Sequence, residues 1–195
     1  MDDTGNMRVR AYARASYGSF EEGATLTDRP GRTVLRLTGK DPVRMLNAIL
    51  TNEVPQEPNL GIYAALLNPK GRIQTDLRIL KANGNIFVDT EPEGALAAME
   101  ILGRYAPFSR VKVEDLSGGG EPWRILGLYG AHATELLGNL QLAEHESKEL
   151  KIGGVPLFAA GVAVPVTGLD LIGPSSAVGA AKAHLLGLGA NLASP

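Results

Sequence analysis

Two turn signals that stand close together in the middle of the chain constrain its fold more than any other feature. The first is Asn-Pro-Lys-Gly at 68–71 and the second is Ala-Asn-Gly-Asn at 82–85. The Asn-Gly pair of the second accepts the positive φ angles of a type I′ hairpin turn. Apolar segments at 63–68, 72–81 and 86–89 flank the turns, so the sequence predicts three consecutive antiparallel strands. This arrangement argues against a doubly wound parallel sheet.

The rest of the chain mixes strands with helices. Further strands are predicted at 33–37, 110–116 and 123–130, with three or four more within 149–174. Helices are predicted from Pro42 to before Pro55, with Asp41 as the N-cap, and over 91–108, 131–138 and 174–189. Two of these helices carry apolar stripes at helical spacing, one formed by Val43, Leu46, Ile49 and Leu50 and the other by Leu96, Met99, Leu102 and Tyr105. The predicted fold class is α+β, with antiparallel sheets and packed helices.

The chain of 195 residues is long enough for one core or for two small, closely packed subdomains. We interpret residues 1–32 as an N-terminal arm, because acidic pairs at both ends of its Arg-rich and Ser-rich part argue against a transit peptide. The pattern of strand, helix and hairpins then occurs roughly twice. We therefore predict a domain over 33–195 with subdomains at about 33–120 and 121–195.

Composition excludes several kinds of site. The chain has no cysteine, which rules out disulfides, thiolate metal sites and a cysteine nucleophile within it. The three histidines are scattered, so no metal site is predicted. A net charge of −2 gives no basis for broad attraction to nucleic acid, and no segment approaches the ~18 apolar residues of a membrane helix. With no secretory leader pattern, a cytoplasmic location is the default expectation.

A row of polar residues follows the Asn-Pro-Lys-Gly turn and is the best candidate for a site. Side chains two apart on a strand share a face, which places Arg72, Gln74, Asp76 and Arg78 on one side and Ile73, Thr75, Leu77 and Ile79 on the other. The nearby Arg78 is expected to favour the ionised carboxylate of Asp76. Spacing alone fits a solvent-exposed strand better than a binding site, and both readings stay open.

Several spaced motifs add a family resemblance. The segments LRLTGKDPVRMLNAILTNEV and GIYAALLNPKGRIQTDLRIL, followed by RYAPFSRVKVEDLSG and TGLDLIGP, resemble the folate-binding proteins related to the glycine cleavage system T-protein. The resemblance is stronger to the YgfZ-type branch, which is linked to iron–sulfur cluster maintenance. It extends from about residue 33 to the end of the chain.

The resemblance implies a tetrahydrofolate site and its residues. Asp76 matches an aspartate that faces the reactive nitrogens of the folate, and Tyr63 matches a tyrosine that lines the pocket. Asp170 matches a position that is usually Glu and whose carboxylate accepts hydrogen bonds from the pterin ring. Being one methylene shorter, Asp170 is equally compatible with an exposed strand residue.

The sequence also departs from the family. It lacks the K-G-C-Y-x-G-Q-E motif of the YgfZ-type branch, and the C-terminal barrel domain is expected to be absent. The T-protein branch has paired carboxylates after the turn, whereas this chain has Thr75 before Asp76. The leading hypothesis is a tetrahydrofolate-binding protein that supports iron–sulfur cluster assembly or repair, with iron–sulfur proteins or assembly factors as partners. The alternatives are an aminomethyltransferase-type one-carbon transfer, in which Asp76 would be catalytic, and a non-catalytic interaction domain.

Overall fold

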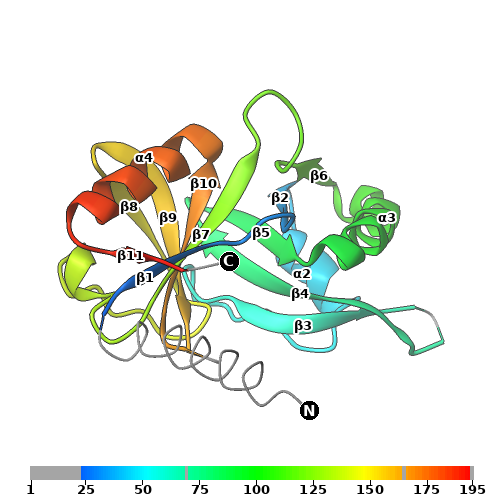
Figure 1. The fold of residues 1–195 in the computed structure, drawn as a ribbon. Helices are drawn as coiled ribbons and strands as arrows, with labels where there is room; N and C mark the ends of the chain where they lie inside the picture. Colours follow the sequence, from blue (N-terminus) through cyan, green and yellow to red (C-terminus); the bar gives the residue numbers. More distant parts are fainter. Residues whose placement is uncertain (1–22, 69, 164–165, 194–195) are drawn as a thin grey trace, which may run out of the picture.

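The fold consists of two antiparallel sheets that pack against each other, each covered by helices (Figure 1). We describe it from a computed structural model, which covers residues 23–68, 70–163 and 166–193. Most of the predicted N-terminal arm therefore lies outside the described residues. The α+β class and the antiparallel sheets are confirmed.

The first sheet has the strand order β3-β4-β5-β2-β6, and all its neighbours are antiparallel. Its strands are β2 (Thr33–Gly39), β3 (Ile62–Leu67), β4 (Ile73–Ala82), β5 (Asn85–Thr90) and β6 (Val111–Asp115). The helices α2 (Pro42–Asn47) and α3 (Ala95–Tyr105) belong to this half, together with the 3-10 turns η1 (Pro92–Gly94) and η2 (Ala106–Ser109). The predicted three-stranded meander is thus β3, β4 and β5, and positive φ angles of 55° at Asn83 and 67° at Gly84 confirm its Asn-Gly turn.

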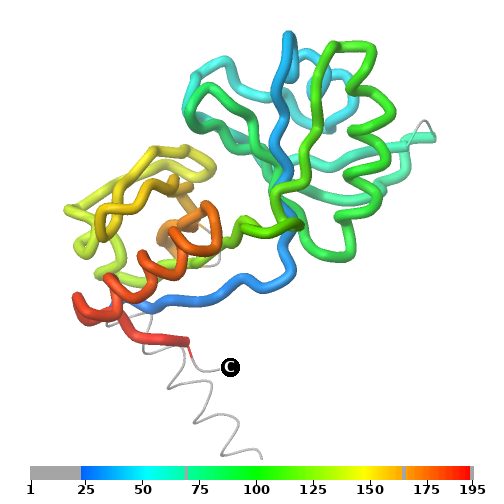
Figure 2. The backbone as a smooth tube through the Cα atoms, turned by 90° about the horizontal axis from the view of Figure 1, so that it is seen from above, coloured from blue at the N-terminus to red at the C-terminus, as the bar shows by residue number. Residues whose placement is uncertain are grey.

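The second sheet has the order β11-β1-β7-β10-β9-β8, in which only the short β1–β11 pair is parallel. Its strands are β1 (Thr25–Asp28), β7 (Trp123–Tyr129), β8 (Ser147–Ile152), β9 (Val155–Val162), β10 (Gly168–Pro174) and β11 (Asn191–Leu192). The helix α4 (Ser175–Gly187) packs on this sheet. Strand β1 comes from the range predicted as an arm, so within the described residues the chain passes from the second half to the first and then returns (Figure 2).

Each half has its own core, and a third cluster joins them. Leu37, Leu66 and Leu102 are among the buried residues of the first half, and Leu126 and Leu171 are among those of the second. The joining cluster lies between the sheets and contains Val34, Leu80, Ala82, Phe87, Ile125, Phe158, Ala160 and Ile172. Burial of this shared apolar surface fixes how the two sheets face each other.

The structure corrects the sequence prediction at both apolar stripes. Asp41 does cap α2 by accepting a hydrogen bond from the Arg44 backbone N–H at 3.1 Å. The helix ends at Asn47, however, so that Ile49 and Leu50 lie beyond its end.

In α3 the buried residues are Ala98 and Leu102, whereas the predicted stripe residue Leu96 is 86% exposed. Small residues such as alanine let a helix lie close to a sheet. The buried face of α3 is therefore rotated away from the stripe of larger side chains that the sequence predicted.

Two further predictions were wrong. Residues 131–138 contain only a short 3-10 turn, η3 (Glu135–Leu137), rather than an α-helix. Ile73 was expected on the apolar face of β4 but is 69% exposed. The pairing of β3 with β4 shifts register between Leu66 and Leu67, opposite the start of β4, and this irregularity interrupts the alternation of faces there.

No helix among the described residues combines the length and the apolar character needed to cross a membrane.

Candidate functional site

A pocket of about 570 Å³ lies where the two halves meet, and it brings together all three residues predicted from the sequence. Tyr63 and Asp76 come from adjacent strands of the first sheet, and Asp170 comes from β10 of the second. The remaining lining residues are Arg29, Arg32, Leu77, Arg78, Glu91, Glu144, His145, Gly161 and Val162. A concave site of this size, built by two packed units, is the usual setting for small-molecule binding.

The accessible wall of the pocket begins with a tyrosine–carboxylate pair. The hydroxyl of Tyr63 donates a hydrogen bond to Asp76 Oδ2. In the antiparallel register Tyr63 lies opposite Arg78 and Asp76 lies opposite Ala65, so Tyr63 and Asp76 are diagonal neighbours on one face. Tyr63 is 50% exposed and Asp76 is also exposed, so a carboxylate and an aromatic face are presented side by side to a ligand.

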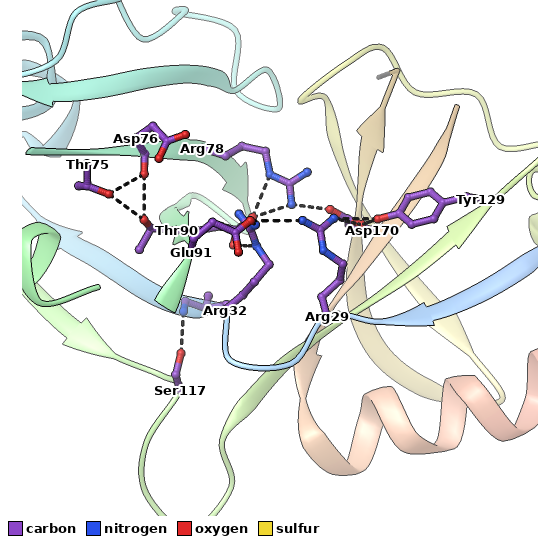
Figure 3. Close-up of polar contacts among 12 residues, drawn as sticks. Arg29, Arg32, Thr75, Asp76, Arg78, Thr90, Glu91, Ser117, Tyr129 and Asp170 are labelled. Atoms are coloured by element: carbon purple, nitrogen blue, oxygen red, sulfur yellow. Dashed lines mark hydrogen bonds and ion pairs between the residues drawn. The ribbon is translucent and has the colours of Figure 1, made fainter. Parts of the chain in front are cut away.

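The backbone of Asp76 is fixed from the opposite side of the strand. Thr90 Oγ1 donates to the Asp76 carbonyl oxygen at 2.8 Å, and Thr75 Oγ1 lies 3.3 Å from Thr90 Oγ1 (Figure 3). Thr75 is buried, as the alternation predicted. Thr75 stands where the resemblance to the T-protein branch implied a carboxylate. In this chain its side chain helps to hold the strand in place.

Arg78 forms the centre of the opposite, buried wall. Its Nε and Nη2 atoms donate to Asp89 Oδ2 at 3.0 and 2.7 Å, and Nη2 donates to Asp170 Oδ2 at 2.6 Å. Burial alone lowers the pKa of Arg78, but the charges of Asp170 and Asp89 outweigh burial and raise it. Arg78 is therefore a permanent cation neutralised by one carboxylate from each sheet.

Two further arginines extend this arrangement. Arg32 donates through Nε to Asp89 Oδ1 at 2.6 Å and through Nη1 to Glu91. Arg29 Nη2 lies 3.7 Å from Glu91 Oε1. Arg29 and Arg32 flank the turn between β1 and β2, which is the segment that passes from one half of the molecule to the other.

Tyr129 completes a closed ring of polar contacts. Its hydroxyl receives a hydrogen bond from Arg29 Nη1 at 3.0 Å and donates to Asp170 Oδ1, while Arg29 Nη1 lies 3.8 Å from Asp170 Oδ1. Burial raises the pKa of Tyr129, and the negative charge of Asp170 adds to this effect. We call this set the ionic ring; it consists of Arg29, Arg32, Arg78, Asp89, Glu91, Tyr129 and Asp170 (Figure 3). Its three arginines balance its three carboxylates.

The ionic ring changes the interpretation of the polar row on β4. Asp76 and Arg78 both line the pocket, but Arg78 turns to Asp89 and Asp170 rather than to Asp76. Arg72 and Gln74 are exposed near the strand start and do not line this pocket. The solvent-exposed reading is therefore wrong for Arg78, which is buried.

Asp170 is fully buried, with 0% of its surface exposed, so the reading of it as an exposed strand residue is also wrong. Both of its oxygens accept hydrogen bonds, Oδ2 from Arg78 and Oδ1 from Tyr129. A carboxylate offers about four lone-pair positions, of which these two bonds use two. The same bonds also give Asp170 a structural role that the sequence did not indicate.

Sequence reasoning missed His145. It precedes β8, lines the pocket, and its ring stacks on that of Tyr63, with centroids 6.5 Å apart and an interplanar angle of 17°. Burial lowers its pKa, an effect that Glu144 opposes and Arg78 reinforces. No motif or spacing marked His145, because its role comes from the packing of two distant segments. Among the described residues, no group of three or more His, Asp or Glu side chains is arranged to hold a metal ion.

Comparison with known proteins adds three kinds of similarity. The family described as the GCVT N-terminal domain matches residues 6–164. The iron-sulfur cluster assembly factor IBA57 homolog, mitochondrial, of Mycosarcoma maydis is 27% identical over 128 residues, which are 53% of this chain and 32% of that protein. The tRNA-modifying protein YgfZ of Hamiltonella defensa subsp. Acyrthosiphon pisum is 32% identical over 108 residues, 54% of this chain and 31% of that protein.

Among solved structures, the crystal structure of glycine cleavage system aminomethyltransferase T from Bartonella henselae superimposes with a TM-score of 0.75 at 20% identity. The match covers 89% of this chain and 48% of that one, and it shows a shared fold. The matched segments span about a third of the length of the two curated relatives.

Proposed function

This chain belongs to the family of the GCVT N-terminal domain, and from that premise we propose that its central pocket binds a reduced folate, tetrahydrofolate, in support of iron–sulfur cluster assembly or repair. Asp76, Tyr63 and Asp170 are the proposed binding residues. The pocket volume of about 570 Å³ is in the range of small-molecule sites.

The observation that carries the proposal is the exposed Tyr63–Asp76 pair. A reduced folate carries N–H groups at the edges of its pterin, and the pyrimidine half of that ring system is flat. Asp76 accepts one hydrogen bond from Tyr63 and has further lone pairs for ligand N–H groups. Tyr63 supplies an aromatic surface at low conformational cost, because its hydroxyl is already held.

Asp170 is proposed to accept hydrogen bonds from the pterin at the buried end of the pocket. A pterin presents two parallel N–H donors, which suit both oxygens of a carboxylate. Because Arg78 and Tyr129 already donate to those oxygens, the ligand must use the remaining lone pairs. Arg78 then holds Asp170 in place while the ligand binds.

The link to iron–sulfur clusters is supported by a relative that is named as an iron–sulfur cluster assembly factor. It is tested in a bacterial host lacking its own YgfZ-type protein, by measuring the activity of a [4Fe–4S] enzyme. We expect this chain to restore that activity and Asp76→Ala to restore less of it. If the unmodified chain and Asp76→Ala restored the enzyme activity equally, the cellular role would not depend on the proposed folate site.

The binding site itself is tested by anaerobic isothermal titration of the chain with tetrahydrofolate. We expect saturable binding by the unmodified protein and a loss of about tenfold or more in affinity for Asp76→Ala, since an interaction of a charged group contributes about 1.5–3 kcal/mol. Glu100→Ala, which removes an exposed carboxylate on α3, is the matched control and should bind normally. The absence of heat at high micromolar tetrahydrofolate would falsify the proposal, and so would unchanged binding by Asp76→Ala.

A further inference from the structure

Arg29 differs from Arg78 of the ionic ring in how few hydrogen bonds its side chain makes. The Arg78 side chain makes three, to Asp89 and Asp170, and is only 9% exposed. Within the described residues the Arg29 side chain makes one, from Nη1 to the Tyr129 hydroxyl at 3.0 Å, and it is 31% exposed. Arg78 is therefore occupied by the fold, whereas the guanidinium of Arg29 keeps donors that these residues do not use.

The unused donors of Arg29 are on its Nε and Nη2 atoms. Nη2 lies 3.7 Å from Glu91 Oε1, which makes an ion pair but not a hydrogen bond. Neither atom is among the buried side-chain atoms without a hydrogen-bond partner, so both are open to solvent. Arg29 also lines the central pocket. An oxygen atom of a ligand in the pocket can therefore accept a hydrogen bond from Arg29.

The backbone holds Arg29 at a fixed point between the two halves. Its N–H donates to the Ile125 carbonyl oxygen on β7 at 3.1 Å. Pro30 follows and disfavours a helical conformation for Arg29, and Gly31 then turns the chain with a φ of 79°. A Cβ at Gly31 would lie 2.9 Å from Pro92 Cγ, so this turn packs closely against the first half. The Arg29 side chain thus projects towards the pocket from a well-anchored position.

Arg29 lies beside the carboxylate of Asp170. Its Nη1 atom is 3.8 Å from Asp170 Oδ1, and Asp170 is fully buried. A ligand that approaches Asp170 therefore meets Arg29 first. An acceptor next to a donor complements a cyclic amide, in which an N–H group lies beside a carbonyl oxygen. The three arginines of the ionic ring already balance its three carboxylates, which favours a neutral carbonyl oxygen over an anionic group at this point.

We propose that Arg29 is a ligand-contacting residue that sets specificity by donating a hydrogen bond to the carbonyl oxygen of a cyclic amide. On the proposed function, on which this inference rests, that amide is the one in the pterin ring of the folate. The Tyr63–Asp76 pair contacts the ligand from the first half, and Arg29, which follows β1, contacts it from the second. The bound ring then bridges the two halves.

The test measures selectivity between two ligands that differ at this carbonyl group. The probes are tetrahydrofolate and tetrahydroaminopterin, in which an amino group replaces the carbonyl oxygen, and binding is measured by anaerobic isothermal titration. The unmodified protein should bind tetrahydrofolate about tenfold or more tightly, because the amino group offers Arg29 no acceptor. Arg29→Met should bind tetrahydrofolate about tenfold more weakly and reduce the preference to less than about threefold. Arg104→Met, which changes an exposed arginine on α3, is the matched control and should keep the full preference.

The preference separates a ligand contact from a structural role, because damage to the fold weakens both probes alike. Equal weakening of both probes by Arg29→Met overturns the inference. Tetrahydropterin, which lacks the glutamate tail, is a third probe. If Arg29→Met weakens tetrahydrofolate but not tetrahydropterin, Arg29 binds the tail carboxylates and the inference is overturned.

The unmodified protein alone distinguishes this inference from the proposed function. If it binds tetrahydrofolate and tetrahydroaminopterin equally well, the specificity contact of Arg29 is overturned and the folate site stands. If it binds no tetrahydrofolate, the proposed function falls and the contact falls with it.

Discussion

The buried wall and the accessible wall of the pocket contain the same kinds of side chain, but these side chains have different roles. At the centre of the ionic ring, Arg78, Asp89 and Asp170 are buried and bonded to one another across the two sheets, whereas Glu91 at its edge is exposed. At the accessible wall, formed by Tyr63, Asp76 and His145, a carboxylate and a tyrosine hydroxyl are also paired, but both residues are exposed. Burial, rather than residue type, thus decides how much each pair of polar groups contributes to the stability of the fold.

The largest expected effect comes from Arg78→Met, which removes the cation at the centre of the ionic ring. Asp89 and Asp170 are left buried without their main counter-charge, so the free energy of unfolding should fall by about 3–5 kcal/mol. Urea denaturation at neutral pH measures this. Arg72→Met, at an exposed position just before the same strand, should cost no more than about 0.5 kcal/mol. Similar losses in the two variants would contradict a structural role for the ionic ring.

Two tyrosines offer a matched comparison of the walls, because each hydroxyl donates to a carboxylate. Tyr129→Phe deprives buried Asp170 of a donor and should lower the free energy of unfolding by about 1.5–3 kcal/mol. Tyr63→Phe removes the same group at an exposed pair and should change stability by less than about 0.5 kcal/mol. Thermal and urea unfolding of both variants gives the comparison. Equal costs would mean that burial does not distinguish the two walls.

Gly161→Ala tests the close approach that positions His145. The new Cβ meets the Ala143 carbonyl oxygen, so the 143–146 segment must shift, and we expect a loss of about 1–3 kcal/mol in the free energy of unfolding. Gly120→Ala is the control, since no atom lies within 4 Å of its added Cβ. A Gly161→Ala protein as stable as the unmodified one would show that the segment adapts freely.

The sequence predicted the parts of the fold that local chemistry determines. The Asn83-Gly84 turn and the capping of α2 by Asp41 depend on nearest neighbours, and both are confirmed. The buried face of α3 and the exposure of Ile73 were predicted wrongly, because they depend on the sheet that each segment meets. Periodicity shows that a helix has an apolar face but not how closely that face approaches its partner.

The sequence predicted the pocket residues that lie in motifs, which are Tyr63 and Asp76 on one hairpin and Asp170 on β10. Tyr63 and Asp76 are separated by a single turn, and the structure places them in contact. Arg29 and His145 lie far from that hairpin in sequence and reach the pocket through the packing of the two sheets. Their positions follow from long-range contacts that spacing along the chain does not encode.

The smallest expected effect concerns the pH dependence contributed by His145. Burial lowers its pKa below the ordinary value of 6.5, with Glu144 opposing the shift and Arg78 reinforcing it. The unfolded chain therefore binds a proton more readily than the folded one, so the contribution of His145 to stability is present above about pH 6.5 and is lost as the pH falls towards its folded pKa. Urea unfolding of the unmodified protein and of His145→Phe, at about pH 7.5 and about pH 5.5, isolates this contribution because the carboxylates are common to both. The unmodified protein should lose more stability on acidification than His145→Phe, and His132→Ala should behave like the unmodified protein. The opposite order would mean that the folded protein stabilises the charged imidazolium relative to the neutral ring.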